Sequence, residues 1–206
     1  MPERTPPKKS ASSPRRIVLG FDPGTVVTGF AVLEKGHPSR LLEVGIVRPK
    51  RGLPIEQRLE QIFLRACELI EAHSPDIVAV EDPFVGKNPN SALVLGQARG
   101  VLLLAAARGG LPVASYSPRA VKASIVGRGS ATKEQVQFMV QRLLGLREPP
   151  EPLDASDAVA VALCHLHRGG AETAPQHREV DPASLARNPE DVELIARWKA
   201  GGRKRG

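Results

Sequence analysis

Four acidic residues have the types and the spacing that metal-assisted hydrolysis requires. Asp22 and Glu81 each end a short apolar run, and Asp154 and Asp157 stand three residues apart where a helical pattern begins. Residues three apart share one face of a helix, and sites in open α/β sheets form beyond the carboxyl ends of the strands. Mg²⁺ prefers oxygen ligands, so the four positions predict one shared site for divalent ions.

The chemistry explains why several carboxylates would gather in one place. Two divalent ions about 3.5–4 Å apart can activate a water and stabilise a leaving oxygen during phosphodiester hydrolysis. Carboxylates that lie this close repel one another and raise each other's pKa values. We therefore expect the metal-free site to be strained, and ion binding to stabilise the folded protein.

Each acid also has a purely structural interpretation. Asp22 would be the first residue of an Asp-Pro-Gly turn, and Glu81 would mark the exit of a strand. Asp154 and Asp157 would be the N-cap and the third residue of a helix, where acids complement the helix dipole. Spacing alone favours these interpretations for each residue taken singly, so the metal-site hypothesis depends on the set and on its surrounding motifs.

The apolar patterns predict the elements that must position these acids. The runs at 17–22, 27–33 and 41–47 are β-rich and separated by turns, which predicts an antiparallel meander. Further strands are predicted at 76–81 and 111–116. Helical spacing is found at 55–72, 91–108, 118–126, 132–144 and 154–167. This order predicts an α/β fold with a ribonuclease-H-like, mixed five-stranded sheet flanked by helices.

The composition narrows the class of partner. The 206 residues carry 29 Lys and Arg against 22 Asp and Glu, a formal net charge of +7. This balance favours polyanions, nucleic acid above all, but charge alone fits a soluble protein that is simply basic equally well. Aromatic residues make up only 3%, which argues against a single-strand binder built on stacked aromatic platforms. We expect neither a secretory signal nor a bilayer-spanning run. Cys67 and Cys164 lack partners at zinc spacing and are interpreted as buried free thiols suited to a reducing cytoplasm.

The chain is predicted to hold one domain between two tails. Residues 1–15 are rich in Pro, Ser and basic groups, which predicts a disordered basic arm, either solubilising or making non-specific phosphate contacts. Residues 16–168 contain every element of the predicted core. Residues 169–206 lose the periodic pattern and are predicted to be mostly disordered, with one short helix at 191–199.

Four stretches together carry a family resemblance. They read IVLGFDPGTVVTGFAV from residue 17, VEDPFVGKNPNSALVLGQARGV from residue 80, AVKASIVGRGSATKEQV from residue 120 and LDASDAVAVALCH from residue 153. In order and spacing they resemble the RuvC family of Holliday-junction resolvases over residues 16–168. The segments 84–100 and 154–162 are the most specific, whereas a DPGxxxTG turn also occurs in actin-like ATPases.

The resemblance implies a role for each matched acid. Asp22, Glu81 and Asp157 match the family's metal-binding carboxylates, which implies two Mg²⁺ or Mn²⁺ ions per active site. Asp154 matches a fourth position that is Asp in some members and His in others.

Basic and aromatic positions carry further implied roles. Lys122 and Lys133 match basic positions near the active site that hold phosphates or stabilise charge in the transition state. Phe84 matches an aromatic residue that inserts at the centre of the junction. Arg128 is a further candidate for DNA binding, on its charge alone, as are Arg99 and Arg119.

The implied activity is resolution of four-way DNA junctions by paired symmetric nicks, in recombination and DNA repair, together with the RuvA and RuvB branch-migration proteins. The two-fold symmetry of a junction predicts a homodimer, and the mostly apolar helix at 91–108 is either its interface or simply buried in the monomer core. Two alternatives stay open. An actin-like ATPase is suggested by residues 22–29, and a non-catalytic junction-binding module would keep the same fold.

Overall fold

The computed structural model describes residues 16–82 and 89–168, with side chains described from residue 92 onward in the second stretch. Its strands are β1 (Ile17–Asp22), β2 (Thr28–Glu34), β3 (Arg40–Val47), β4 (Ile77–Glu81) and β5 (Val113–Tyr116). Its helices are α1 (Ile55–His73), α2 (Pro89–Arg108), α3 (Pro118–Val126), α4 (Lys133–Leu144) and α5 (Leu153–His167). Every predicted core element is present. The predictions for residues 1–15 and 169–206 lie outside the described residues.

The five strands form one sheet in the order β3-β2-β1-β4-β5. The β1–β2 and β2–β3 pairs are antiparallel, as the predicted meander requires. The β1–β4 and β4–β5 pairs are parallel. This mixed sheet confirms the predicted ribonuclease-H-like α/β fold.

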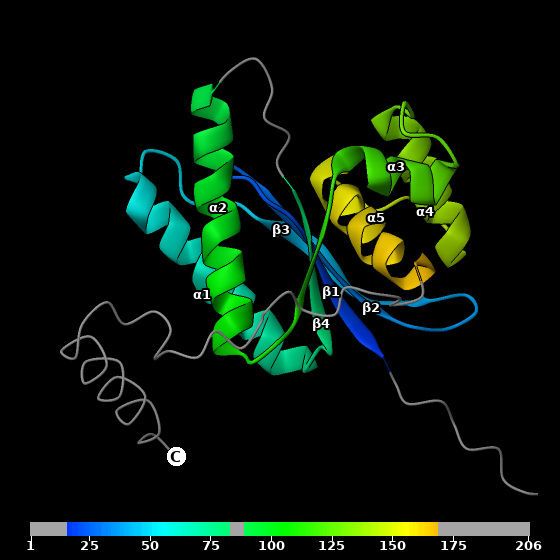
Figure 1. Ribbon diagram of the computed structural model, residues 1–206, viewed down its shortest axis with the longest axis horizontal. Coiled ribbons are helices and arrows are strands. Elements are labelled where there is room, and N and C mark those ends of the chain that lie inside the picture. Colours follow the sequence, from blue (N-terminus) through cyan, green and yellow to red (C-terminus); the bar gives the residue numbers. More distant parts are fainter. Residues whose placement is uncertain (1–15, 83–88, 169–206) are drawn as a thin grey trace, which may run out of the picture. The chain divides into compact units, whose positions relative to one another are not determined.

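Helices cover the sheet on both faces (Figure 1). Helices α1 and α2 lie on one face, and α3, α4 and α5 lie on the other. The alternation of side chains along a strand explains the two cores. In β1, Ile17, Leu19 and Phe21 point into the α1–α2 core, whereas Val18 points into the core around α5.

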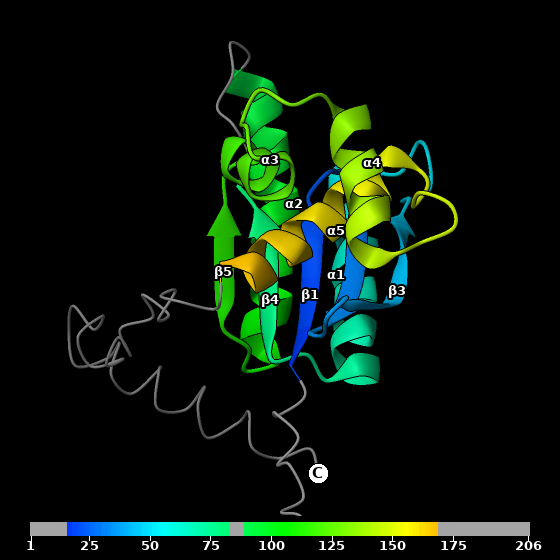
Figure 2. The ribbon, with the colours of Figure 1, turned by 90° about the vertical axis from the view of Figure 1, so that its right-hand side faces the viewer.

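Helix α5 crosses the sheet at close range (Figure 2). Its residues 155 and 156 and 158–166 are buried, and most of them are small or β-branched. A methyl group on Gly20 of β1 would lie 2.6 Å from the Ala158 carbonyl oxygen. The glycine is therefore required for this approach, and α5 is fixed directly against the strand that carries Asp22.

Local sequence signals start the other helices of this layer. The Ser117 side chain caps α3 ahead of Pro118. Thr132 and Gln135 form a complete capping box at α4. Helix α5 instead begins after Pro152 without a side-chain cap. The interpretation of Asp154 and Asp157 as N-cap and third helical residue is therefore wrong, since they are the second and fifth residues of α5.

The prediction that both cysteines are buried is confirmed for only one of them. Cys164 is buried as predicted, but Cys67 is only half-buried. Among the described residues, no helix is long and apolar enough to cross a membrane.

Gly29 gives a test of how the sheet holds α5. In the variant Gly29→Ala, the new methyl group would collide with the backbone carbonyl oxygen of Asp154. That oxygen cannot move without shifting the start of α5. We expect the variant to lose about 3 kcal/mol of unfolding free energy in urea titrations. The control is Gly45→Ala in β3, where the new methyl group meets the side chain of Phe30. An equal loss in both variants would contradict this account.

Candidate active site

Strand alternation brings Asp22 and Glu81 together. Phe21 of β1 pairs with Val80 of the parallel strand β4, so Asp22 and Glu81 follow at neighbouring strand ends. Their side chains share the face of Val18 and Ala79, which pack in the core around α5. Neighbouring strands lie about 4.8 Å apart. The two carboxylates are therefore next to each other on the face that α5 covers.

The turn after β1 is held by Thr28 rather than by Asp22. The Thr28 hydroxyl donates to the Gly24 carbonyl oxygen at 2.6 Å and accepts from the Gly24 N–H at 3.3 Å. Arg58 of α1 donates to the Thr25 carbonyl oxygen through its Nε at 3.0 Å and also through its Nη2. Within the described residues, no hydrogen bond or ion pair uses the Asp22 carboxylate. The Asp22 carboxylate is therefore available to another partner. Its side chain does not form the Asp-Pro-Gly turn, because Thr28 does so instead.

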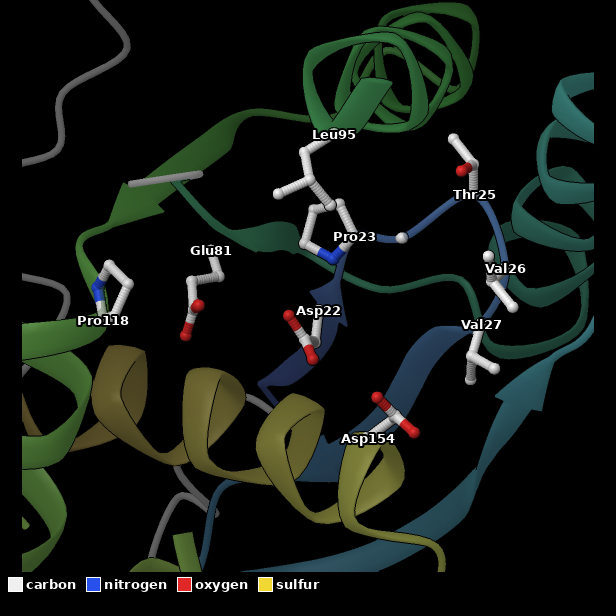
Figure 3. Close-up of a pocket in the computed structure, with 10 residues that line it drawn as sticks. Asp22, Pro23, Thr25, Val26, Val27, Glu81, Leu95, Pro118 and Asp154 are labelled. Atoms are coloured by element: carbon white, nitrogen blue, oxygen red, sulfur yellow. The ribbon is translucent and has the colours of Figure 1, made fainter. Parts of the chain in front are cut away.

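Helix α5 supplies the other two acids. Figure 3 shows Asp154 on its first turn, in one row with Asp22 and Glu81. These three acids line a cavity of about 540 Å³ that the turn 23–27 borders. A second hollow of about 160 Å³ shares Asp22 and Glu81 and adds Asp157, Lys122 and Lys133. The structure thus brings all six predicted catalytic residues around two adjoining cavities.

The electrostatics of this cluster are unfavourable for the ionised acids. Burial, together with the charges of Asp157 and Asp154, raises the pKa of Asp22 to about 7. Burial and the charges of Asp22 and Asp157 raise the pKa of Glu81 to about 8. Both shifts follow from desolvated like charges, and such perturbed groups in a cleft are typical of functional sites.

Lys133 is the cation that balances part of this charge. Its Nζ lies 2.5 Å from Asp157 Oδ2. Partial burial acts to lower the pKa of Lys133, but the hydrogen bond and the nearby carboxylates outweigh it and the pKa is raised. Lys133 in turn lowers the pKa of Asp22, and both Lys133 and Lys122 lower that of Glu81. The positive charges of the two lysines therefore offset part of the rise in the pKa values of these acids.

The donor set fits a hard divalent cation, because all four converging acids offer only carboxylate oxygens. The raised pKa values of Asp22 and Glu81 add a physical reason, since a bound cation would favour their ionised forms. In the conformation of the described residues, no three Asp, Glu, His or Cys side chains are placed to hold one ion together. Lys133 holds one of the Asp157 oxygens in this conformation.

The remaining predicted residues lie elsewhere. Arg99 of α2 forms an ion pair with Asp82 at 2.7 Å and donates to the Ser115 hydroxyl, so it ties α2 to the ends of β4 and β5. Arg128 donates to Gln135 and lines a separate hollow on α3 and α4. Arg119 is exposed. Phe84 lies outside the described residues.

Sequence reasoning missed two residues that position the site. The buried Thr28 fixes the turn that follows Asp22, and Arg58 fixes Thr25 from a helix 33 positions away. The threonine had a local signal, because it stands just after the Asp-Pro-Gly turn. Arg58 had none beyond its charge, since its contact depends on how α1 packs.

Known proteins match this chain over most of its described length. The family model described as crossover junction endodeoxyribonuclease RuvC matches residues 18–165. The protein of that name from Pelotomaculum thermopropionicum is 46% identical over 152 residues, which cover 73% of this chain and 93% of the relative. The one from Hydrogenovibrio crunogenus is 50% identical over 150 residues, or 72% of this chain and 86% of the relative.

The fold agrees with a solved structure of the same kind. Thermus thermophilus RuvC in complex with a Holliday junction substrate superposes with a TM-score of 0.71 at 37% identity, covering 75% of this chain and 94% of that one. The matched region contains both strand-end acids, both α5 acids and both lysines. The chain therefore belongs to the RuvC family of crossover junction endodeoxyribonucleases.

Proposed function

We propose that this chain resolves four-way DNA junctions at the site formed by Asp22, Glu81, Asp154 and Asp157. One observation carries the assignment. Asp22 and Glu81 stand side by side on neighbouring strand ends with strongly raised pKa values, facing the acids of α5. In a family named for endodeoxyribonuclease activity, this is the arrangement that a divalent-metal nuclease needs. Membership of this family argues against the alternative of an actin-like ATPase.

In this proposal the four carboxylates hold two Mg²⁺ or Mn²⁺ ions. Ions bound there would activate the attacking water and stabilise the leaving 3′ oxygen, so that each cut leaves a 5′ phosphate. Asp22 and Glu81 would hold the ions from the sheet, together with the two acids of α5, and Asp157 would bind an ion through the oxygen that now accepts from Lys133. Lys133 and Lys122 would stabilise negative charge that develops on the phosphate.

We propose the DNA contacts from charge and, for Phe84, from the family resemblance; a family member has been solved in complex with a Holliday junction substrate. Phe84 inserts at the centre of the junction, and Arg128 and Arg119 contact phosphates at the α3–α4 side. Lys122 and Lys133 bind the phosphate next to the cut. Phosphate contacts of this kind dominate the affinity of proteins for DNA.

A homodimer would supply the two matched sites that paired nicks need. Helix α2 buries Ala98, Leu102, Ala105 and Ala106 against α1 and the sheet. Its other face exposes Leu93 at 67% and Leu104 at 54%, with the small residues Gly96 and Gly100 between them. An apolar face with small central residues allows two helices to approach closely. The outer face of α2 is therefore our proposed dimer interface.

The interface has a direct test. We expect the native protein to sediment at twice the chain mass of 22.1 kDa, and Leu93→Glu with Leu104→Glu to sediment as a monomer, because two carboxylates would be desolvated at the contact. Leu64→Glu with Phe138→Glu is the matched control, since both side chains are over half exposed on other helices. A native monomer, or a double variant on α2 that stays dimeric, would refute the interface.

The cellular setting follows the same reasoning. The family resemblance supports cooperation with RuvA and RuvB in recombination and repair. Free thiols at Cys67 and Cys164 suit a reducing cytoplasm, which we propose as the compartment.

The proposed function is tested with a labelled synthetic four-way junction. Native protein is incubated with Mg²⁺, with Mn²⁺ and with chelator, beside a linear duplex of the same sequence. We expect paired nicks at symmetric positions in the junction only, and only with a divalent ion. Binding without nicks in either metal would instead favour the non-catalytic junction-binding module.

A further inference from the structure

A second charged surface adjoins the active site. Three basic residues, Arg48, Lys50 and Arg51, follow β3 directly, and we name them the 48–51 cluster. All three are exposed, whereas Pro49 between them is buried. They line a hollow of about 170 Å³ together with Val26, Gly52 and Arg58. Val26 also lines the cavity of the catalytic acids, so the two hollows meet at that residue.

The strand pairing fixes how far the cluster lies from the acids. Asp22 pairs with Gly29 of β2, and Gly29 pairs with Ile46 of β3. These three residues stand in one row across two strand spacings, which is about 10 Å. Arg48 follows Ile46 by two positions, so it lies beyond the same ends of the strands as the acids. The cluster therefore lies more than about 10 Å from the acids, and since DNA rises about 3.4 Å per base pair, this is at least about three base pairs from the site of cutting.

The loop that carries the cluster is anchored to α1 and closed by a turn of its own. The Lys50 N–H donates to Gln61 Oε1 of α1 at 3.2 Å, and the Leu53 N–H donates to the Lys50 carbonyl oxygen. Arg58 is engaged with Thr25, the neighbour of Val26. The cluster is therefore held in a fixed position relative to the turn after Asp22.

The charge of this surface is not balanced within the described protein. In the segments 16–82 and 89–168, no acidic side chain forms an ion pair with Arg48, Lys50 or Arg51. Residues 48–58 contain four basic residues and one acid, Glu56. Like charges held this close repel one another. A polyanion would relieve the repulsion by neutralising these charges, and the release of counterions from the polyanion would favour binding.

We propose that the 48–51 cluster binds the phosphate backbone of the DNA arm that leaves the active site over β3 and α1. The inference rests on the proposed junction-cutting function and adds a contact that fixes one arm relative to the acids. Several exposed cations in a row fit successive phosphates better than one small anion, which would need a closed pocket of donors. The contact is independent of base sequence, because it reaches the backbone alone.

The test measures how junction binding depends on salt. The triple variant Arg48→Gln, Lys50→Gln and Arg51→Gln is compared with native protein by fluorescence anisotropy, with a labelled four-way junction and chelator from 50 to 300 mM salt. Each phosphate contact contributes about 0.9 to the slope of log K against log salt. We expect the slope to become shallower by about 2 to 3, and binding at physiological salt to weaken by on the order of tenfold or more.

A matched triple variant separates this site from general charge. Lys35→Gln, Arg108→Gln and Arg147→Gln remove the same charge from exposed positions elsewhere, and we expect the native slope. At saturating protein and low salt, the 48–51 variant should still nick the junction with a divalent ion, since its acids are intact. Thermal melting confirms that both triple variants fold.

Two results would overturn the proposal. One is a native salt slope in the 48–51 variant, and the other is an equal change in both triple variants. The proposed function can fail separately. Native protein that binds junctions with the expected slopes but never nicks them would refute the nuclease assignment and leave the arm contact standing.

Discussion

We expect Asp22→Asn to abolish junction cutting and to leave junction binding close to native. The amide keeps the shape of the side chain but loses the charge that a divalent ion needs. Metal assistance contributes several kcal/mol to such hydrolysis, so the single-turnover rate should fall on the order of 10³-fold or more. Binding is dominated by phosphate contacts from Lys and Arg, so the dissociation constant measured by anisotropy should change less than about threefold.

The control for Asp22→Asn is Glu60→Gln, which removes one negative charge from an exposed position on α1. It should cut and bind as the native protein does. Native-rate cutting by Asp22→Asn would show that the acid is not a ligand. A parallel loss of binding would mean that Asp22 shapes the DNA surface instead of the reaction.

We expect the metal-free protein to become less stable as pH rises from about 5 to 8.5. The pKa of Asp22 is raised to about 7 and that of Glu81 to about 8, from ordinary values of 3.8 and 4.5. The folded state therefore binds more protons than the unfolded state in this window, and the free energy of unfolding falls with pH. This stabilisation is complete below the pKa values that Asp22 and Glu81 have in the unfolded state. It is lost as pH rises through the pKa values that they have in the folded state. The total effect is several kcal/mol, since each pKa unit corresponds to about 1.36 kcal/mol.

Urea unfolding in chelator at pH 5.5, 7 and 8.5 measures this effect. Asp22→Asn and Glu81→Gln should each flatten the profile and be more stable than native protein at pH 8.5. Saturating Mg²⁺ should raise the unfolding free energy of the native protein at pH 8.5, because ligands that bind only the folded state stabilise it. A profile that is flat or rises with pH in native protein would refute the raised pKa values.

The sequence predicted the fold well where the physical signal is local. β1 was predicted with its observed bounds, because a buried run ends at Asp-Pro-Gly. The strand-end positions of Asp22 and Glu81 were predicted because each acid ends a short apolar run. The helix-cap interpretation of Asp154 was wrong because α5 begins one residue earlier, after Pro152.

Long-range contacts could not be predicted in this way. The ion pair of Lys133 with Asp157 spans 24 positions and depends on how α4 packs on α5. The anchoring of Thr25 by Arg58 depends on the packing of α1 in the same manner. The basic 48–51 cluster was visible in the sequence, but its distance from the acids follows only from the pairing of β3 with β2.

The most direct test of the account is to locate the ions. Crystals of the full chain with a four-way junction and Mn²⁺ would be measured at the manganese absorption edge. We predict anomalous peaks bounded by Asp22, Glu81 and the two α5 acids, with Asp157 released from Lys133. Manganese found only elsewhere, in protein that cuts the same junction in solution, would contradict the claim that these carboxylates form the catalytic metal site.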